Sequence, residues 1–457
     1  MSNEGLERAQ QKMRDAGVTD AAINVFTHYY HELEHGASGL IPEETIRPLT
    51  DVESLEEQDI GKDAAREALS KTVLIKLNGG LGTSMGMEKA KSLLPVRNGK
   101  TFLDIICEQV KAAREYYDVS LPLIFMNSFR THDDTLEALK AHPGIEVDGI
   151  PLDFVQNQEP KLLADTLEPV TWPADPSLEW CPPGHGDIYT ALLGSGVLKT
   201  LLDKGYRYAM TSNSDNLGAS PHAQVAAWFA ASGAPYCAEV CHRTPADRKG
   251  GHLAIRKEDG QLILRDTAQT PPEQMNYFTD EHRHPFFHTN NLWFDLQVLY
   301  DTLVERKAVL GLPLIKNEKT VDPTDASSPK VVQIECAMGA AVQVFPGATA
   351  VVVPRSRFLP VKTTNDLLLV SSDVYELDDM GLLNMLTKRA PVIDLEPKYY
   401  KKIADYQERF SGGIPSIRNV STLKVKGNCY FSDGVVLEGQ VTIQEGDPAG
   451  TRVDVTA

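Results

Sequence analysis

Hydrophobic and polar positions change their spacing near residue 72. Before that point the chain shows helical spacing, as in residues 21–34, and an acidic segment around residues 51–63. From Thr72 on, short apolar runs alternate with runs of helical spacing. This alternation is typical of an α/β domain with a largely parallel sheet.

Several of the predicted strands end in polar residues. In open α/β sheets ligands collect at the carboxyl ends of strands, so these endings are where a site is expected. The predicted strands are residues 73–77, 121–127, 151–156 and 208–215, the predicted helices are 101–117 and 131–140, and residues 252–266 are typical of an antiparallel hairpin around Asp259 and Gly260.

The last part of the chain repeats every six residues. Two apolar positions per repeat are followed by a turn former, a pattern that favours a short parallel β-helix. A meander of ordinary strands is the alternative, because few repeats are present. The first apolar series is Leu423, Cys429, Val435 and Val441, the second is Val425, Phe431, Leu437 and Ile443, and the turn formers are Gly427, Asp433 and Gly439.

Composition narrows the function classes. The chain has 457 residues, 42% of them hydrophobic, which is ample for two or three domains. Lys and Arg number 45 against 63 Asp and Glu, a formal net charge of −18. General nucleic-acid binding needs clustered positive charge and is disfavoured. An acidic protein that binds phosphates must supply local lysines, backbone amides or a divalent metal.

The cysteines and the chain start favour a cytoplasmic protein. Six cysteines without a CxxC pair fit reduced thiols. Cys237 and Cys241 could form half of a zinc site, but the alternation around them equally indicates a buried strand, and no second half-site follows. The charged first residues lack the apolar stretch of a secretory signal, and no apolar run is long enough to span a membrane.

Residues 77–96, LNGGLGTSMGMEKAKSLLPV, carry four glycines directly after a predicted strand. Such glycines permit positive φ and let backbone amides approach phosphate oxygens. The loop lacks the Gly-Lys-Ser/Thr of a Walker A loop, and Met85 occupies the third glycine position of the dinucleotide fingerprint. A plain tight turn is the alternative. Lys91 favours a phosphate site because its ammonium could reach the same oxygens, although a solvated surface lysine would look the same in the sequence.

These residues resemble the UDP-glucose pyrophosphorylases (UTP:glucose-1-phosphate uridylyltransferases) of the type common in eukaryotes. The resemblance spans roughly residues 74–442 and rests on several motifs in the same order. Related sugar nucleotidyltransferases have an arginine in this loop, where this chain has Ser84 after Thr83, which favours the UDP-glucose branch. The motifs are KLNGGLGTSMG (76–86), KSL (91–93), MNSF (126–129), PPGHGDIY (182–189), SNSDNLG (212–218), KGG (249–251), TNNLW (289–293) and VPRSRFLPVKTT (353–364).

The resemblance implies a reversible uridylyltransferase. An oxygen of glucose-1-phosphate attacks the α-phosphorus of UTP, which gives UDP-glucose and pyrophosphate, and Mg²⁺ is the implied cofactor. These small molecules are the implied partners, with no nucleic acid and no membrane. Two alternatives stay open: a UDP-sugar pyrophosphorylase that also uses galactose-1-phosphate, and a non-catalytic UDP-sugar-binding paralogue. The second would not need Lys91, Asp215 and Lys362 together, because binding a hexose requires none of that charge.

The resemblance also implies the site residues. Lys91 and Lys362 are the implied catalytic residues and Asp215 the metal ligand, although Asp215 alone would be read as a turn or helix-capping residue. Gln156 would pair with the uracil edge. The implied nucleotide-binding residues are Leu77, Asn78, Gly79, Gly80, Lys91, Gln156, Gly184, Asn213, Asp215 and Lys362, and the implied sugar-phosphate-binding residues are His185, Gly251, Asn290, Asn291 and Glu335.

The predicted fold class is α/β. We expect a central mixed, largely parallel, Rossmann-like (GT-A-like) nucleotidyltransferase sheet flanked by helices, a helical N-terminal segment (1–70), a catalytic domain (71–390) and a C-terminal linker helix with a short left-handed parallel β-helix (391–457). Three features depart from the family: His288 replaces the usual asparagine, Ala90 replaces the proline before Lys91, and the chain stops at Ala457, short of the longer β-helix of many eukaryotic members. A homo-oligomer is possible for this chain, but the resemblance does not fix its form, because the longer β-helix takes part in oligomer contacts in the family.

Overall fold

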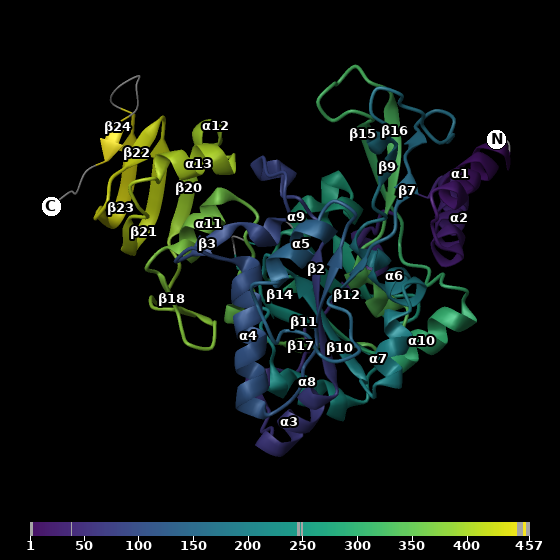
Figure 1. Cartoon of the computed structure of the whole chain (residues 1–457), viewed down its shortest axis with the longest axis horizontal. Helices are drawn as coiled ribbons and strands as arrows, with labels where there is room; N and C mark the ends of the chain where they lie inside the picture. The colour runs from purple at the N-terminus through teal and green to yellow at the C-terminus, as the bar shows by residue number, and fades with distance from the viewer. Residues whose placement is uncertain (1–2, 38, 245–246, 248–249, 446–450, 454–457) are drawn as a thin grey trace.

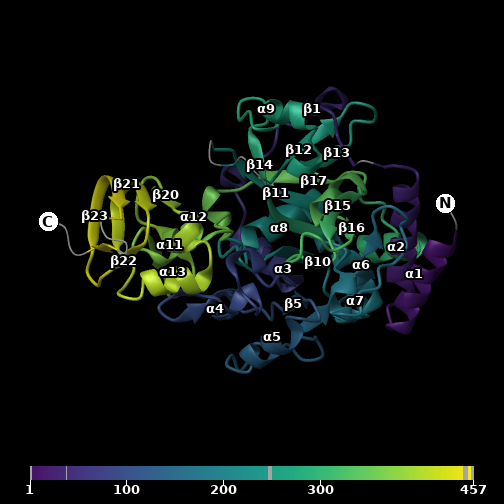
Figure 2. The same ribbon diagram turned by 90° about the horizontal axis from the view of Figure 1, so that it is seen from above.

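A computed structural model describes residues 3–37, 39–244, 247, 250–445 and 451–453. Lys249 of the KGG motif lies outside the described residues. Helices cover both faces of a central sheet, the N-terminal helices lie at one end of the long axis, and the C-terminal strands lie at the other (Figures 1 and 2).

The central sheet has seven strands within the described residues, and their order differs from the sequence order. β14 is antiparallel to both of its neighbours, while the pairs β10–β2, β2–β5, β5–β6 and β11–β17 are parallel. The predicted strands are confirmed with ends shifted by up to two residues. Across the sheet the order is β17 (Thr349–Val352), β11 (Tyr236–His242), β14 (Phe286–Asp295), β10 (Tyr208–Asn213), β2 (Thr72–Asn78), β5 (Leu123–Asn127) and β6 (Asp153–Val155).

The parallel strands bring four polar strand endings to one edge. β10, β2, β5 and β6 are neighbours and run in the same direction, so the residues that follow them leave the sheet on the same side. These endings include Asn78, Asn127, Gln156 and Asn213. The fold therefore gathers the candidate residues that the sequence predicted at strand ends.

Strand β2 is buried along its whole length, and its side chains alternate between the two faces of the sheet. Val73, Ile75 and Leu77 belong to the core on one face, and Leu74 belongs to the core on the other. By the same alternation, the Lys76 side chain lies on the same face of the sheet as that of Leu74. The first core is completed by α1 (Asn3–Asp15), α2 (Asp20–Glu34), α6 (Ile188–Gly194), α7 (Val197–Asp203) and α10 (Leu296–Glu305), and the second by α3 (Lys62–Ser70), α4 (Phe102–Tyr117), α5 (His132–Leu139) and α8 (Ala223–Ser232).

The start of α4 shows how local sequence fixes an element. The Asp104 amide donates to the Thr101 hydroxyl at 3.1 Å, and the Asp104 carboxylate accepts from the Thr101 amide at 2.8 Å. This capping box satisfies two amides that a helix start leaves without partners. It explains why the predicted helix begins where it does.

Smaller sheets surround the main one. The hairpin predicted over residues 252–266 is confirmed as β12 and β13, which pair antiparallel, with β1 at its edge. β15 and β16 project from the body beside the N-terminal helices (Figure 1). The bounds are β1 (Ile46–Pro48), β12 (Gly251–Arg256) and β13 (Leu262–Asp266); β8 (Leu162–Leu163), β15 (Ile315–Thr320) and β16 (Lys330–Glu335); β7 (Glu159–Pro160) with β9 (Trp180–Cys181); β3 (Pro95–Arg97) with β4 (Lys100–Thr101); and the short α9 (Met275–Phe278).

At the C-terminal end the pairs β20–β21, β21–β23 and β22–β24 are parallel, whereas β18 and β19 pair antiparallel. In β21 and β23, Leu423 pairs with Val441 and Val425 pairs with Ile443, an offset of 18 residues in each case. That offset equals three of the six-residue repeats seen in the sequence. The elements here are α11 (Thr364–Ser371), β18 (Tyr375–Leu377), β19 (Leu383–Met385), β20 (Val392–Leu395), α12 (Pro397–Tyr400), α13 (Ile403–Arg409), β21 (Ser416–Lys426), β22 (Cys429–Phe431), β23 (Val436–Gln444) and β24 (Thr451–Val453).

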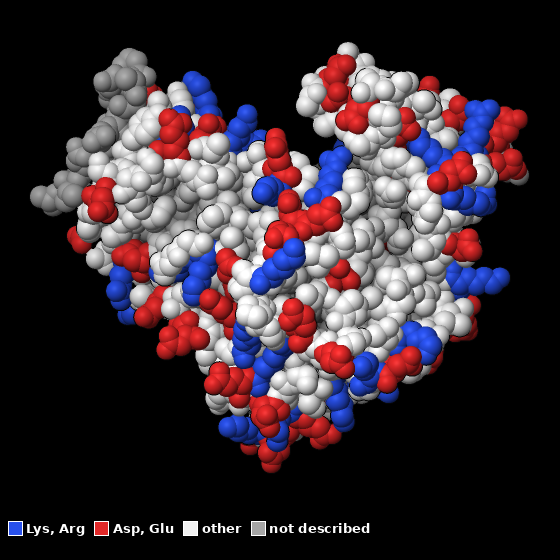
Figure 3. All heavy atoms as spheres, in the orientation of Figure 1, with Lys and Arg blue, Asp and Glu red and all other residues white. Residues whose placement is uncertain are grey.

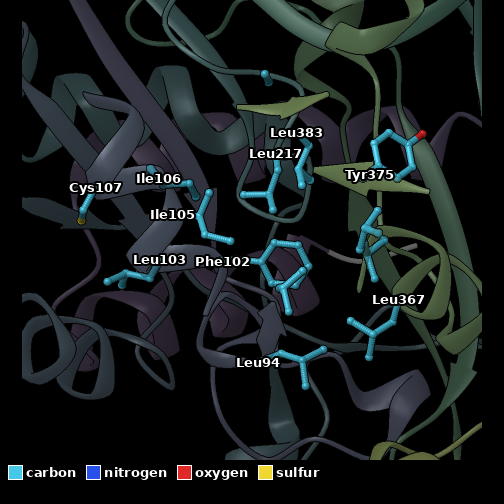
Figure 4. Packing of buried hydrophobic residues seen from close by; sticks show 14 of the residues in the cluster. Leu94, Phe102, Leu103, Ile105, Ile106, Cys107, Leu217, Leu367, Tyr375 and Leu383 are labelled. Carbon is cyan, nitrogen blue, oxygen red and sulfur yellow. The ribbon is translucent and has the colours of Figure 1, made fainter. Parts of the chain in front are cut away.

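One hydrophobic core joins this end to the central sheet. Leu94 and Phe102 pack in the same cluster as Leu367, Tyr375 and Leu383 (Figure 4), and the cluster continues into the strands of the C-terminal end. The C-terminal end is thus held by apolar packing as well as by chain connection.

The cysteines are all buried and free. Cys237 and Cys241 lie in β11, which confirms the buried-strand interpretation of that segment. In the described part of the chain, none of the helices combines the length and the apolar character needed to span a bilayer.

Candidate active site

The glycine-rich loop leaves β2 and folds back on itself. Gly82 and Gly86 have φ angles of 63° and 73°, in the left-handed region that favours glycine. The Lys91 amide donates to the Gly80 carbonyl at 3.1 Å, which closes the loop. At the base of the loop, the Asn78 amide group donates to Asn127 at 2.8 Å and so ties β2 to β5.

Gly79 is needed for close approach rather than for an unusual backbone angle. A Cβ atom at this position would lie 2.9 Å from both Nε2 and Oε1 of Gln156, closer than real Cβ contacts. The Gln156 amide therefore lies directly over the glycine backbone. The structure thus brings the Gln156 side chain and the start of the loop together, two segments that the resemblance assigns to nucleotide binding.

Lys91 and Lys362 converge on the buried carboxylate of Asp215. The Lys91 Nζ donates to Asp215 Oδ2 at 2.6 Å, and the Lys362 Nζ lies 3.0 Å from the same oxygen. The Asp215 and Lys91 side chains are 9% and 15% exposed, whereas that of Lys362 is 56% exposed and faces solvent. Burial acts to raise the pKa of Asp215, but the two ammonium groups outweigh it and hold the pKa below its ordinary value. The carboxylate is therefore charged at neutral pH.

Backbone bonds join the loops that carry these groups. The Val361 amide donates to the Asp215 carbonyl at 3.1 Å, and the Lys91 ammonium also donates to the Val361 carbonyl. The Asn216 side chain accepts from the Leu359 amide at 2.8 Å. The loop after β10 and the loop after β17 thus form one unit beside the glycine-rich loop.

Beneath this unit lies a buried ion pair that the sequence analysis did not identify. Arg357 donates to both oxygens of Glu239, at 2.7 and 2.9 Å, and the two side chains are 4% and 0% exposed. Arg357 also donates to the Ser220 carbonyl at 2.8 Å, and the Trp293 indole donates to Glu239 at 2.9 Å. A charged residue inside the apolar run of residues 236–241 was the signal in the sequence.

Asn291 is bonded to both members of this buried pair. Its amide nitrogen donates to Glu239 at 3.1 Å and to the Arg357 carbonyl at 3.2 Å, and its oxygen accepts from Asn216. The residue is fully buried. Both amide hydrogens of Asn291 are used in these bonds, so only the second lone pair of its oxygen is left for a further donor.

Lys76 is a second buried charge that the sequence analysis left without a role. Its ammonium donates to the Ser212 hydroxyl at 2.8 Å and to the Ala219 carbonyl at 2.7 Å. Burial first, and the Arg357 charge second, lower the pKa of Lys76 to about 7. Lys76 connects β2 to both ends of the loop that carries Asp215.

The loop that carries Gln156 is fixed by Asp187. The Asn157 amide and its side-chain nitrogen donate to the two oxygens of Asp187, at 2.6 and 2.8 Å. Burial raises the pKa of Asp187 to about 7, against the effect of these bonds. The backbone amide of Gln156 in turn donates to the backbone carbonyl of Asn127 at 2.7 Å. Leu77 takes part through its backbone carbonyl, which accepts from the Ser214 amide at 3.1 Å.

The candidate sugar-phosphate residues surround the loop that contains Gly184 and His185. Gly184 has a φ of 79°, and a Cβ atom there would lie 2.6 Å from the Cys336 carbonyl and 3.1 Å from the Glu335 Cβ. Glu335 thus lies against the loop. Asn290, with a φ of 62°, donates to Asn213 at 3.2 Å and so connects this region with the nucleotide-binding residues. Gly251 is buried at the start of β12 and packs against Leu264.

His185 is a neutral hydrogen-bond donor in the loop that follows Gly184. Its Nδ1 accepts from the Met338 amide at 3.0 Å, which assigns the proton of the neutral ring to Nε2. Burial of the ring, and then the Lys362 charge, lower the pKa of His185 to about 4. The Nε2 atom can therefore donate to an oxygen of a ligand at neutral pH.

One carboxylate of this site suits a hard divalent ion. Mg²⁺ commonly takes one or two carboxylates and completes its shell with phosphate oxygens and water, so Asp215 alone is a sufficient protein ligand when a nucleotide is bound. In this structure the ammonium groups of Lys91 and Lys362 both bond the Asp215 carboxylate. The phosphate oxygens of a bound nucleotide would offer these ammonium groups other partners. Among the described residues, no cluster of three or more His, Cys, Asp or Glu side chains could hold a metal without such help.

Comparisons with known proteins point to one family. The sequence pattern of the UTP–glucose-1-phosphate uridylyltransferases matches residues 23–438. The enzyme of that name from Solanum tuberosum is 42% identical over 383 residues, which cover 83% of this chain and 78% of the relative. The one from Pyrus pyrifolia is 39% identical over 428 residues, which cover 92% and 88%.

Solved structures agree along the whole chain. A mutant of UDP-glucose pyrophosphorylase from Leishmania major, in complex with UDP-glucose, has a TM-score of 0.92 at 43% identity and covers 99% of this chain and 97% of its own. A Trypanosoma brucei structure named UDP-glucose phosphorylase has a TM-score of 0.90 at 39% identity, with coverage of 99% and 97%.

Proposed function

The chain belongs to the UTP–glucose-1-phosphate uridylyltransferase family, and we propose that it performs this uridylyl transfer in the cleft between the glycine-rich loop, Asp215 and Lys362. The substrates are UTP and glucose-1-phosphate, and the products are UDP-glucose and pyrophosphate. The convergence of two ammonium groups on one carboxylate beside the glycine-rich loop carries this assignment.

The reaction needs no nucleophile from the protein. A phosphate oxygen of glucose-1-phosphate forms a bond to the α-phosphorus of UTP, and the bond from that phosphorus to the oxygen bridging to the β-phosphorus breaks. The bonding electrons leave with pyrophosphate. The protein must hold two polyanions in line and stabilise the charge that develops, so its contribution is positioning and electrostatics.

Lys91 and Lys362 are suited to that task. Both ammonium groups lie within 3.0 Å of Asp215, so a phosphate bound here would meet two positive charges at once. Lys91 is held under the loop by the Val361 carbonyl, whereas Lys362 is half-exposed and can shift toward a ligand. We assign Lys91 to the UTP phosphates and Lys362 to the reacting phosphates.

Gln156 and Gly79 form the candidate base-binding end. The Gln156 amide offers one acceptor and one donor, which complement the N3–H and a carbonyl oxygen of uracil. Its contact with Gly79 fixes the plane of the amide at the start of the loop. Asn213, at the end of β10, lies between this end and the Asn290 side chain.

Magnesium is part of the proposal. Asp215 would hold the ion together with phosphate oxygens, and the ion would supply neutralisation of the triphosphate charge. For the sugar phosphate, His185 Nε2 offers a donor, and Asn290 and Glu335 offer polar groups around the hexose. A cytoplasmic location and a homo-oligomer stay predictions from the sequence.

The parallel pairing of β21 with β23, at an offset of 18 residues, supports a further proposal: the C-terminal end is a short left-handed β-helix. Turns at Gly427 and Gly439, with φ angles of 87° and 74°, fit its corners. The handedness and the number of coils would be read from a crystal structure of the chain, and strands that turn right-handed would contradict the proposal.

The function is tested by pyrophosphate release with UTP, Mg²⁺ and either glucose-1-phosphate or galactose-1-phosphate. We expect turnover with glucose-1-phosphate, and Lys91→Ala and Lys362→Ala should each lower kcat about 10²- to 10³-fold, as for loss of one preorganised donor. Lys199→Ala, in an exposed pair on α7, is the matched control and should keep the wild-type rate. A Lys91 or Lys362 variant with near wild-type kcat would remove that lysine from the mechanism, and equal rates with both sugars would contradict glucose specificity.

A further inference from the structure

Asp187 joins two segments of the candidate site that are 30 residues apart in sequence. One segment follows β6 and carries Gln156 and Asn157. The other is the turn His185–Asp187, which carries the His185 side chain. Asn157 donates its backbone amide to one Asp187 oxygen and its side-chain nitrogen to the other, so both oxygens of the carboxylate take part. Movement of one segment relative to the other would break these bonds.

Each of the two segments is also anchored to a different part of the fold. The backbone amide of Gln156 bonds Asn127 at the end of β5, whereas the Gly186 amide donates to the Cys336 carbonyl, just after β16, at 2.9 Å. The Asp187 carboxylate provides a direct connection between these two parts. It therefore sets the position of Gln156 relative to His185.

This connection needs a charged Asp187. A carboxylate accepts at both oxygens, whereas in a protonated carboxyl one oxygen becomes a donor and the charge that strengthens both bonds is gone. Most acidic groups in Figure 3 lie on the surface, where water stabilises their charge, but Asp187 is only 4% exposed. Burial raises the pKa of Asp187 to about 7, although the bonds from Asn157 act to lower it. The connection is thus gained or lost close to neutral pH.

The neighbouring buried groups do not change their charge in this range. Glu159 is buried, its Oε1 has no hydrogen-bond partner in the described part of the structure, and burial and then the Asp187 charge raise its pKa well above the ordinary value, so it keeps its proton. Burial also raises the pKa of Cys336, and His185, with a pKa of about 4, is neutral. Titratable groups of the surrounding elements are Tyr29 of α2, Glu159 of β7, His185 of the same turn, Glu335 at the end of β16, and Cys336.

We propose that the charged Asp187 carboxylate is a positioning group that holds Gln156 and His185 at the spacing of the two ends of UDP-glucose, so that tight binding requires Asp187 to be deprotonated. The inference rests on the proposed function, because Gln156 is assigned there to the uracil and His185 to the sugar phosphate. It makes Asp187 the link between base recognition and sugar-phosphate recognition, without contact between Asp187 and the reacting atoms.

Calorimetric titration of the full-length chain with UDP-glucose at pH 6 and pH 8 tests this role. The two phosphates of UDP-glucose keep the same charge over this range, so the ligand itself does not titrate. With a pKa of about 7, the charged fraction of Asp187 is about ten times larger at pH 8 than at pH 6. Because only this fraction is competent for tight binding, the affinity of wild type should fall about tenfold from pH 8 to pH 6.

Three variants identify the titrating group. Asp187→Asn keeps the shape but turns an N–H group toward one Asn157 donor, so it should bind about tenfold more weakly than wild type at pH 8 and show no further loss at pH 6. Asn157→Ala removes a bond that lowers the pKa of Asp187, so the midpoint of the pH dependence should move to higher pH. Glu159→Gln is the matched control. It also replaces a buried carboxyl by its isostere, but Glu159 is already neutral, so the wild-type pH dependence should persist.

Equal affinities of wild type at pH 6 and pH 8, or the same pH dependence in Asp187→Asn as in wild type, would overturn the inference. So would a pH dependence that disappears in Glu159→Gln, since Glu159 would then be the titrating group. A comparison of wild type with Asn157→Ala tests the inference even if Asp187→Asn does not fold. A chain that binds UDP-glucose with the expected pH dependence but shows no turnover of UTP with glucose-1-phosphate would contradict the proposed function and leave the role of Asp187 standing.

Discussion

The contact between Gly79 and Gln156 gives a prediction at the scale of two residues. Gly79→Ala would place a Cβ atom 2.9 Å from the Gln156 amide, so the amide must move and the uracil edge would lose its partner. We expect the KM for UTP to rise about tenfold, the effect of losing one good hydrogen bond. The KM is measured at saturating glucose-1-phosphate.

A double variant separates this contact from a general effect on the loop. Gln156→Ala alone should raise the KM for UTP, and it also removes the group that an alanine at position 79 would meet. The effect of Gly79→Ala should therefore be much smaller in the Gln156→Ala background. Additive effects of the two changes would show that Gly79 acts on the loop without Gln156.

Lys76 predicts a pH dependence of stability. Its pKa is about 7 in the folded protein and 10.5 for an ordinary lysine, so between these values the unfolded chain binds more protons. The free energy of unfolding therefore gains a contribution that rises with pH, by about 1 kcal/mol per pH unit. Lys76→Met removes this contribution, so wild type should gain stability relative to the variant from pH 7 to pH 9. Urea unfolding at the two pH values measures the difference, and a constant difference would contradict the lowered pKa.

At the scale of elements, the buried pair of Glu239 and Arg357 joins strands β11 and β14 to the two loops that carry Asp215 and Lys362. Glu239→Gln would leave the Arg357 charge buried without its counter-charge, which costs about 3 to 5 kcal/mol. We expect a loss of this size in urea unfolding, together with a lower kcat because the loops lose their support. The exposed pair on α7 is the control, and Lys199→Ala should cost less than about 1 kcal/mol.

A rescue variant tests whether charge is the cause. In Glu239→Leu with Arg357→Met the whole pair is replaced by apolar side chains, so no charge stays buried. This double variant should be more stable than Glu239→Gln, while its kcat stays low because the bonds to the loops are missing. A double variant with wild-type kcat would remove the pair from the positioning of the site.

The strands show which features could be predicted from the sequence, namely the common edge of the strand ends, and which could not, namely the partners of the buried charges. The strand endings at Asn78, Gln156 and Asn213 were expected at one edge of the sheet, and they lie there because parallel neighbours must end on the same side. Lys76 and Glu239 are charged residues inside apolar runs, but no role was predicted for either. Their partners could not be predicted, since Ser212 and Arg357 are more than 100 residues away and only the fold brings them near. The resemblance assigns Asn291 to the hexose, whereas in this structure its side chain bonds Glu239, Asn216 and the Arg357 carbonyl.

At the scale of the whole molecule, the expected boundary at residues 390 and 391 falls within one hydrophobic cluster. Phe102 and Ile105 of α4 belong to the same core as Val425 and Phe431 of the C-terminal strands. Each large apolar side chain buried there contributes about 1.5 to 3 kcal/mol, so neither part can unfold without exposing the other. The bonds from the Thr364 hydroxyl to the Tyr400 carbonyl and from the Leu395 amide to the Asn365 side chain depend on this packing.

We therefore expect the chain to unfold in one cooperative transition. Two probes report on different parts: the four tryptophans, Trp172, Trp180, Trp228 and Trp293, all precede residue 390, while Cys429 is buried in the C-terminal strands. Tryptophan fluorescence and the labelling of Cys429 by a thiol reagent, located by mass spectrometry, should give the same urea midpoint. Magnesium and UTP should raise both midpoints together, because a ligand bound to the folded state stabilises the whole cooperative unit. A Cys429 midpoint below that of the tryptophans would mean that the C-terminal end opens alone while the central sheet stays folded.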